Sequence, residues 1–381
     1  MGGKQATLRN EPDWAALRRE FPVTERWSYF DLANKAPLPL TIDRAMAAFV
    51  EDTRETGGIE AFSAEGVERA RAEMAGLVGA PPETLAFVQN TAFALNMAAQ
   101  GLRLGDGDSV VIAEEEHASN IFAWRHLEAD GVEVRRVPLR DDGRVHVDDL
   151  LAAMDGSTRA VAVSWVGYIR GHRVNVPKLA EACRERGVLC VIDAIQAVGV
   201  LDVSLEACGA DVVAAGAHKG LFGLNGSGLL YVRREVQDRI RPMVGGFERP
   251  TRGKESDGPL AYPPSAARYE AGNPNYLGIR VLEESAKFLR GIGMASIEAR
   301  IRALTTRLIE GAEARGITVK TPRPWENRAG IVTIELPGDP ETNAARMREA
   351  GVIGSVRGPW FRVSPHFFNT EDEVDALVSL L

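Results

Sequence analysis

The stretch Val188-Leu-Cys-Val-Ile-Asp193-Ala-Ile-Gln196-Ala-Val-Gly199 decides the fold, together with Ala214-Ala-Gly-Ala-His218-Lys219-Gly-Leu-Phe-Gly223 further along the chain. Each stretch begins as an apolar run of the kind that forms a strand buried in a sheet. The first run ends in a carboxylate, Asp193, and the second ends in an amine, Lys219. Both charged groups are therefore expected at the ends of buried strands.

One arrangement explains both of these side chains. A buried carboxylate is costly unless it faces a positive partner, and a lysine at the edge of an apolar strand loses hydration, which favours its neutral, nucleophilic form. An imine between Lys219 and an aldehyde cofactor, with Asp193 holding the pyridinium nitrogen, satisfies both requirements and is typical of pyridoxal phosphate enzymes. Alternatively, Lys219 is a solvated residue of a glycine-rich turn and Asp193 caps a helix.

The composition excludes several classes of protein. With 381 residues, 45% of them hydrophobic, the chain can form two domains, or one large α/β domain with an appendage. The net charge of -8 is spread along the chain without a basic run, so nucleic acid is not an expected partner. No apolar segment reaches the ~18 residues of a membrane span, and the polar N-terminus lacks the apolar core of a signal peptide.

The three cysteines, Cys183, Cys190 and Cys208, show neither a CxxC pair nor the spacing of metal ligands. They are expected to be small buried side chains. We therefore predict no metal site, and we expect a reducing cytoplasmic location.

Strand and helix signals alternate over the first two thirds of the chain. Strands are predicted at 85–89, 109–114, 132–137, 160–166, 188–193, 211–215 and 228–233. Helices are predicted at 41–56, 64–79, 91–103, 118–130, 147–154 and 177–187, after an N-terminal helix and loop within 11–29. This alternation predicts an α/β fold with a mostly parallel sheet, in which ligands bind at the carboxyl ends of the strands.

The pattern changes after Arg233. Residues 245–280 are rich in glycine, proline and polar residues, and a loop of that length in a compact domain is usually functional. A long helix over 278–315 is predicted next, then strands at 317–320, 330–335 and 360–364, helices at 340–350 and 370–381, and a connection over 351–359. We therefore expect a large cofactor-binding domain over 31–280, a smaller α+β domain over 281–381, and an N-terminal segment, 1–30, that packs with the smaller domain.

Other polar residues fall where predicted strands end. Asn90-Thr91-Ala92 open a helix, which offers N–H groups and a hydroxyl to a phosphate, or simply caps the helix. The ring of His117 can stack on a planar cofactor, or lie at the surface in an acidic turn. Arg362, in the middle of a predicted strand, suits a substrate carboxylate, although an arginine on an edge strand would give the same pattern. Asn34 lies on the loop 29–39, which either lines a cleft or forms a solvated turn.

Together these residues resemble the class V aminotransferase family of pyridoxal phosphate enzymes, which includes cysteine desulfurases, selenocysteine lyases and isopenicillin epimerase-like proteins. The most specific part of the resemblance is Asp193-Ala-Ile-Gln196 followed by His218-Lys219, and the resemblance extends from Tyr29 to the segment that begins at Arg362. It implies the PLP-dependent transferase fold of type I, with a large, mostly parallel seven-stranded sheet domain and a smaller α+β C-terminal domain. It also implies a homodimer with shared active sites.

The resemblance further implies a set of cofactor contacts, namely Thr91, Ala92, His117, Asp193, Gln196, His218, Lys219 and Asn273. Lys219 would form the Schiff base, Asp193 would pair with the pyridinium nitrogen, and Gln196 would contact the ring hydroxyl. His117 would stack on the ring, and Thr91 and Ala92 would hold the phosphate together with His218. Asn273 matches a position from which the family reaches the phosphate bound by the partner subunit.

The substrate would be a small molecule, an amino acid, bound by Arg362 and Asn34. Cysteine desulfurases carry a nucleophilic cysteine just before the carboxylate-binding arginine, but residues 351–360 here contain none, so a persulfide-forming desulfurase is not expected. Gly216 replaces a serine that would donate to the phosphate. Tyr168 replaces an asparagine near the ring, and we predict it as a catalytic residue beside Lys219 and His117.

Two further arginines, Arg170 and Arg173, place positive charge near the predicted cleft. This charge would suit a substrate with extra carboxylates, or would lie on a solvated loop.

By the resemblance, the enzyme would act at Cα or Cβ of its substrate through an external aldimine. The first expectation is a C–S lyase that performs β-elimination on a cysteine-type or S-substituted amino acid. Aminotransferase, epimerase and decarboxylase reactions stay open because they start from the same species. A non-catalytic relative that keeps the fold as a binding module is the alternative from a different class.

Overall fold

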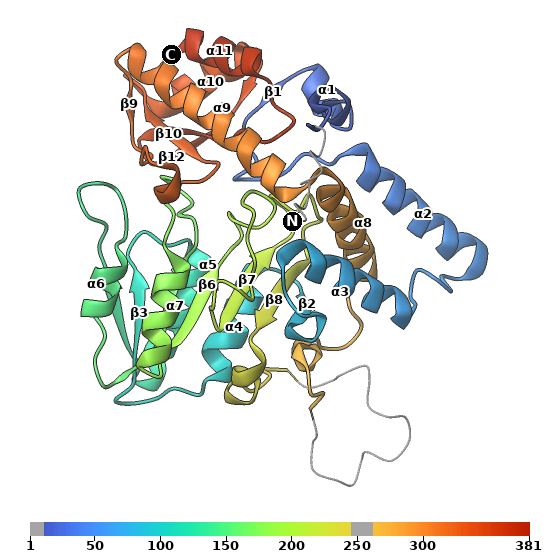
Figure 1. Cartoon of the computed structure of the whole chain (residues 1–381), viewed down its shortest axis with the longest axis vertical. Coiled ribbons are helices and arrows are strands. Elements are labelled where there is room, and N and C mark those ends of the chain that lie inside the picture. Colours follow the sequence, from blue (N-terminus) through green and yellow to red (C-terminus); the bar gives the residue numbers. More distant parts are fainter. Residues whose placement is uncertain (1–10, 245–261) are drawn as a thin grey trace, which may run out of the picture.

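The structure, a computed structural model, describes residues 11–244 and 262–381 (Figure 1). Its centre is a seven-stranded sheet with the strand order β2-β8-β7-β6-β5-β3-β4. The strands are β2 (Leu85–Val88), β3 (Ser109–Ala113), β4 (Glu133–Val137), β5 (Thr158–Ser164), β6 (Leu189–Asp193), β7 (Val212–Gly216) and β8 (Gly228–Val232). Neighbours are parallel from β7 to β4, whereas β8 is antiparallel to both β7 and β2. The predicted α/β fold is confirmed.

Helices cover both faces of this sheet because its central strands are apolar on both sides. Ile192 of β6 belongs to the same buried cluster as Leu179 of α7 (Val176–Glu185), and the adjacent Val191 belongs to a second cluster with Leu95 of α4 (Thr91–Gly101). Residues of α3 (Ala64–Val78) and α8 (Tyr276–Ile292) join the first cluster, and residues of α5 (Ala118–Arg125) join the second. The result is a three-layered α/β/α arrangement, with α2 (Leu40–Thr56) and α6 (Val147–Ala152) further out in Figure 1.

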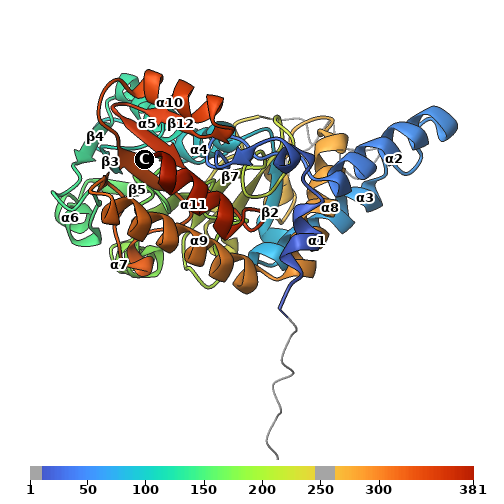
Figure 2. The same ribbon diagram turned by 90° about the horizontal axis from the view of Figure 1, so that it is seen from above.

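The C-terminal region contains a four-stranded antiparallel sheet with the order β12-β13-β10-β9. Its strands are β9 (Thr318–Val319), β10 (Val332–Glu335), β12 (Ser355–Arg357) and β13 (Trp360–Val363), and its helices are α9 (Met294–Ala314), α10 (Pro340–Glu349) and α11 (Glu371–Leu380). Apolar side chains of these elements, among them Leu308, Ile334 and Leu377, form a separate buried core. Figure 2 shows α9 and α11 lying alongside each other.

The N-terminal segment contacts this C-terminal region. Arg18 of α1 (Trp14–Arg18) pairs with Glu373 at 2.8 Å, and the ring of Trp14 packs against Phe367. Strand β1 (Ser28–Tyr29) pairs in parallel with β11 (Val352–Ile353). The division into domains over 31–280 and 281–381 stays a proposal, and α8 crosses that boundary to pack on α2 and α3.

Two expectations from the sequence are wrong. The single long helix over 278–315 is two helices, α8 and α9, because Gly293 between them adopts a φ of 96°, which a helix does not allow. The connection over 351–359 contains β11 and β12, which are too short to show a periodic pattern and exist through pairing with distant strands. The part of the predicted loop at 245–261 lies outside the described residues.

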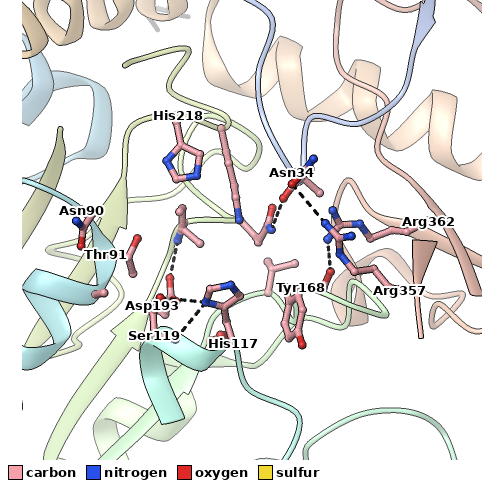
Figure 3. A pocket seen from close by; sticks show the side chains of 17 residues that line it. Asn34, Asn90, Thr91, His117, Ser119, Tyr168, Asp193, His218, Arg357 and Arg362 are labelled. Carbon is pink, nitrogen blue, oxygen red and sulfur yellow. Dashed lines mark hydrogen bonds between the residues drawn. The ribbon is translucent and has the colours of Figure 1, made fainter. Parts of the chain in front are cut away.

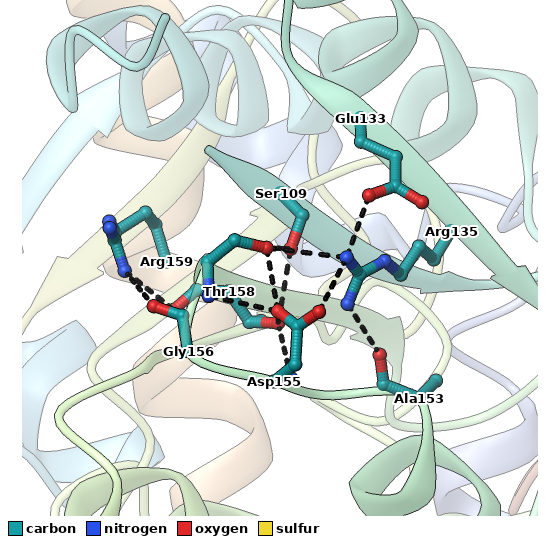
Figure 4. Close-up of polar contacts among 9 residues, drawn as sticks. Ser109, Glu133, Arg135, Ala153, Asp155, Gly156, Thr158 and Arg159 are labelled. Atoms are coloured by element: carbon teal, nitrogen blue, oxygen red, sulfur yellow. Dashed lines mark hydrogen bonds and ion pairs between the residues drawn. The ribbon is translucent and has the colours of Figure 1, made fainter. Parts of the chain in front are cut away.

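The amino ends of β3 and β5 meet at a polar cluster on the sheet edge opposite the predicted site (Figure 4). Arg135 of β4 pairs with Glu133 at 2.7 Å and with Asp155 at 2.8 Å. Ser109 and Thr158 share a hydrogen bond of 3.1 Å between their hydroxyl groups. These groups satisfy one another, which suits a structural role. Across the described ranges, no helix is both long and apolar enough to cross a bilayer.

Candidate active site

A cavity of about 410 Å³ opens at the carboxyl ends of the strands (Figure 3). Every residue that the sequence predicted for the site, apart from Asn273, lines this cavity. The lining residues are Ala33, Asn34, Asn90, Thr91, Ala92, His117, Ser119, Ser164, Val166, Tyr168, Asp193, Ile195, Gln196, His218, Lys219, Arg357 and Arg362. Six of these, Ala33, Ser119, Ser164, Val166, Ile195 and Arg357, were not predicted as site residues, and Asn90 was named only as a residue that opens the helix.

Lys219 is a buried amine just beyond β7. Its side chain is 9% exposed, and burial lowers its pKa to about 8, although the charge of Asp193 acts in the opposite direction. The turn that carries Lys219 packs closely on the segment after β6. A Cβ on Gly199, which has a φ of +77°, would lie 2.1 Å from the carbonyl oxygen of Gly220. Only glycine fits at this position, so the close contact fixes where Lys219 enters the cavity.

Asp193 is a buried carboxylate at the end of β6. Burial raises its pKa to about 6, while the hydrogen bond from the N–H of Ile195 and the charge of Lys219 lower it. At neutral pH the carboxylate is therefore ionised but poorly solvated, and a cationic ring nitrogen would be a favourable partner. The imine role of Lys219 and the ring-nitrogen role of Asp193 stay predictions with which these surroundings are compatible.

Behind Asp193 lies a second buried carboxyl group, Glu116. Ser164, which pairs with Asp193 across β5 and β6, donates both its N–H and its hydroxyl to Glu116. Burial raises the pKa of Glu116 to about 7, and the charge of Asp193 raises it further. Nothing in the sequence pointed to this residue, because it stands in a run of three glutamates, a pattern typical of a solvated turn.

The N-terminus of α4 lies at the cavity where the sequence predicted an anion site. Asn90 caps the helix by accepting from the N–H of Phe93 at 2.9 Å, and the Thr91 hydroxyl accepts from the N–H of Gly216 at 2.8 Å. The first N–H groups of a helix have no partner within it, so those of Thr91 and Ala92 remain for a ligand. Burial lowers the pKa of His218 to about 4, with Lys219 adding to the effect, so its ring is a neutral hydrogen-bonding group at pH 7.

His117 and Tyr168 lie on the loops after β3 and β5. Their rings meet edge to face, with centroids 5.2 Å apart and planes at 89°. Burial lowers the pKa of His117, and the charges of Lys219, Arg357 and Arg362 lower it further. Burial also raises the pKa of Tyr168, so its hydroxyl stays protonated at neutral pH. Two neutral aromatic groups therefore stand beside the lysine.

Arg362 supplies a buried guanidinium from β13. It is 1% exposed and lies between β12 and β10, so the edge-strand alternative does not hold. Nη1 donates to the carbonyl of Tyr168 at 2.6 Å and Nε donates to the Ser355 hydroxyl at 3.3 Å. Nη2 is buried without a hydrogen bond and lies 3.6 Å from Asp31. A substrate carboxylate would satisfy this donor.

Gln196 lines the main cavity, whereas Asn273 does not. Gln196 donates to the carbonyl of Ala33 at 2.8 Å, which ties the loop after β1 to the site. Asn273 lines a separate cavity of about 280 Å³ with Ser227 and Tyr269, and its reach to a partner's phosphate stays a prediction.

Arg170 and Arg173 do not line the main cavity. Arg170 pairs with Glu115 at 3.2 Å, and Arg173 pairs with Glu298 at 3.8 Å. Their charge is therefore compensated by the fold.

The cavity fits pyridoxal phosphate. A buried lysine with a lowered pKa, a buried carboxylate and a helix N-terminus match the aldehyde, the ring nitrogen and the phosphate of this cofactor, respectively. No cluster of metal-ligating side chains occurs within the described ranges.

The geometry agrees with comparisons to known proteins. The aminotransferase class-V family model matches residues 28–377. A probable cysteine desulfurase of Methanothermobacter thermautotrophicus is 30% identical and aligns over 95% of each chain, and one of Pyrococcus abyssi is 30% identical over 96% of each. The solved cysteine desulfurase of Thermococcus onnurineus has a TM-score of 0.87 at 26% identity and covers 96% of each chain.

A cystine C–S lyase solved with its reaction product, cysteine persulfide, has the same fold, with a TM-score of 0.86 at 20% identity over 94% of this chain and 98% of that one. The family match spans most of the sequence and includes every residue of the cavity. The chain therefore belongs to the class V aminotransferase family and is a pyridoxal phosphate-dependent enzyme.

Proposed function

We propose that the protein is a pyridoxal phosphate-dependent C–S lyase. It would cleave the Cβ–S bond of a cysteine-type or S-substituted amino acid by β-elimination. The Cα–H and Cβ–S bonds break, the sulfur leaves as a thiol, and one water converts the remaining three-carbon unit into pyruvate and ammonia. The names of the cysteine desulfurase relatives support a sulfur-containing substrate.

The observation that carries this proposal is a cofactor cavity without a thiol. The chain has three cysteines, and Cys183, Cys190 and Cys208 are buried in the core rather than in the cavity lining. A desulfurase needs a cysteine to accept sulfur as a persulfide. Here the leaving sulfur has no such acceptor, so release as a free thiol is the favoured outcome.

The chain's own groups fit the proton transfers of an elimination. Bound pyridoxal phosphate supplies an electron sink for the pair left when the Cα–H bond breaks. Lys219 Nζ, with a pKa of about 8, takes the Cα proton near neutral pH. The Tyr168 hydroxyl, kept protonated by burial, donates a proton to the leaving sulfur. Arg362 binds the α-carboxylate and so fixes the orientation of the substrate.

Incubation with L-cysteine distinguishes the proposal from desulfuration. A lyase produces sulfide, pyruvate and ammonia in equal amounts, whereas a desulfurase produces alanine. Lys219→Ala should abolish product formation and alter the visible absorption of the bound cofactor. Alanine as the main product would refute the lyase proposal.

S-Methylcysteine in deuterated water tests the remaining family reactions. With a 2-oxo acid added as the amine acceptor, formation of the corresponding amino acid would indicate transamination, a racemised substrate would indicate epimerisation, and carbon dioxide would indicate decarboxylation. Equal yields of methanethiol, pyruvate and ammonia support elimination.

A homodimer with shared active sites and a cytoplasmic location remain part of this proposal. Size-exclusion chromatography with light scattering checks the first, and fractionation of the source cells checks the second.

A further inference from the structure

Two arginines of the β12–β13 hairpin, Arg357 and Arg362, line the cavity. Ser355 pairs with Arg362, and Arg357 pairs with Trp360, in the antiparallel register of the two strands. Side chains two residues apart on a strand share a face. Ser355, Arg357, Trp360 and Arg362 therefore lie on the same face, and Figure 3 shows Arg357 and Arg362 at the same side of the cavity.

The cationic side chains here differ in how their charge is compensated. Arg362 lies 3.6 Å from Asp31, and Arg170, whose guanidinium stacks on Trp360, pairs with Glu115 at 3.2 Å. Among the residues that the structure describes, Arg357 has only neutral partners, namely the carbonyl of Val356 at 2.7 Å and the side-chain oxygen of Asn34 at 3.4 Å. Within the described ranges, no carboxylate lies at ion-pair distance from Arg357.

This uncompensated charge belongs to the substrate end of the cavity. Arg357 lines the cavity and is one of the charges that act on His117, Tyr168 and Lys219. The phosphate site lies at the N-terminus of α4, on the other side of the view in Figure 3. The α-carboxylate of an amino acid occupies the free donor of Arg362. Arg357 is partly exposed, so solvent reaches its guanidinium when no substrate is bound. A substrate that covers it without a further anionic group would leave this charge with neutral partners only.

The geometry points to a substrate whose side chain carries a second anionic group, such as a carboxylate or sulfonate, bound by Arg357. This inference rests on the proposed function and names the substrate class of the same site. Arg362 lies opposite Ser355, and Arg357 lies two residues beyond Ser355 on the same strand. The backbone positions of the two arginines are therefore offset by roughly 7 Å along the hairpin. That spacing suits an anionic group a few bonds beyond Cβ, on the far side of the sulfur. Arg357 would thus determine specificity, whereas Arg362 would bind any amino acid.

Two substrates test the effect of a negative charge on the side chain. S-Carboxymethyl-L-cysteine and S-carbamoylmethyl-L-cysteine have nearly the same shape, but the first ends in a carboxylate and the second in an amide. The holoenzyme should favour the carboxylate probe by a factor of about 10 to 100 in kcat/KM, mostly through KM, because a charge-assisted hydrogen bond is much stronger than a neutral one. Arg357→Gln should reduce this ratio to near one.

Lys35→Gln is the matched control. Lys35 is an exposed lysine whose charge reaches His218 and which does not line the cavity, so this variant removes an equal charge near the site without touching the substrate end. The ratio should be unchanged in this variant. A wild-type ratio near one, or a preference that persists in Arg357→Gln, would overturn the inference even when both probes release thiol.

A binding measurement keeps the inference separate from the reaction. L-Glutamate and L-glutamine have no leaving group at Cβ and again differ in a carboxylate against an amide. Calorimetric titration of the holoenzyme should show tighter binding of glutamate, and Arg357→Gln should remove the difference. If no probe yields thiol, the lyase proposal fails, yet the binding difference still decides the role of Arg357. Equal binding of the two ligands to the wild type would refute that role.

Discussion

Replacing Glu116 with glutamine should change how the stability of the fold depends on pH. The carboxyl group belongs to a buried residue, of which 5% is exposed. One oxygen accepts from the Ser164 N–H at 2.7 Å, and the other accepts from Asn120 at 3.1 Å and from the Ser164 hydroxyl. Burial raises its pKa from 4.5 to about 7, despite the opposing effect of these hydrogen bonds. Near neutral pH, the native protein therefore holds this carboxyl group protonated about half of the time.

The sign and size of the effect follow from linkage. Between pH 4.5 and pH 7 the folded state binds more protons at Glu116 than the unfolded state does, so stability falls as pH rises. The contribution is fully present below the unfolded pKa and is lost as pH rises through the folded pKa. A shift of that size corresponds to about 3 kcal/mol of unfolding free energy. Glutamine cannot accept from Asn120 in the same way, which adds a pH-independent cost of about 1–3 kcal/mol.

Urea unfolding of the wild type and Glu116→Gln, each at several pH values and one cofactor concentration, measures the difference. The wild type should lose about 3 kcal/mol relative to the variant between acidic and mildly alkaline pH. Glu114→Gln, at an exposed position two residues earlier, is the matched control and should give a flat difference curve. A flat curve for Glu116→Gln would refute a protonated carboxyl group at this site.

Three further predictions concern the cavity. Cofactor-free protein should bind pyridoxal phosphate at a rate that rises with pH up to about 8 and is constant above it, because the neutral Lys219 amine is the reactive form. Stopped-flow absorbance measures this rate, and a rate independent of pH would contradict the prediction. Arg362→Gln should raise KM about 30-fold or more in steady-state assays, since a buried charged partner is lost; an unchanged KM would exclude carboxylate binding there. Tyr168→Phe should lower kcat by about 100-fold or more, and the loss in kcat should be larger for substrates whose leaving thiol is more basic. An equal loss in kcat for all leaving thiols would argue against proton donation by Tyr168.

The sheet and the centre of the site were readable from the sequence for a physical reason. Strands buried on both faces appear as short apolar runs, and parallel strands bring their carboxyl ends to one edge. Asp193 and Lys219 follow two such runs directly, so their meeting could be deduced without knowing any contact. The same logic located Thr91 and His117.

The features that the sequence did not reveal depend on pairing between distant segments. Arg357 fell in a predicted connection because β12 is only three residues long and exists by pairing with β13. The sequence left open whether Arg170 and Arg173 face a substrate or solvent, and the structure pairs them with Glu115 and Glu298, which are far away in the sequence. A local pattern records which charges are present, and only the fold determines which of them are cancelled.

Because the other charges are compensated, the two ends of the cavity present different anion-binding groups. One end has the N–H groups of α4 and a neutral His218, which suit a phosphate. The other end has Arg362 and the uncompensated Arg357, which suit carboxylates. Asp193 is the single carboxylate among the described lining residues, and it lies between these ends. A cofactor that places its phosphate at the N-terminus of α4 and its ring nitrogen at Asp193 would therefore leave the arginine end of the cavity to the carboxylates of the substrate.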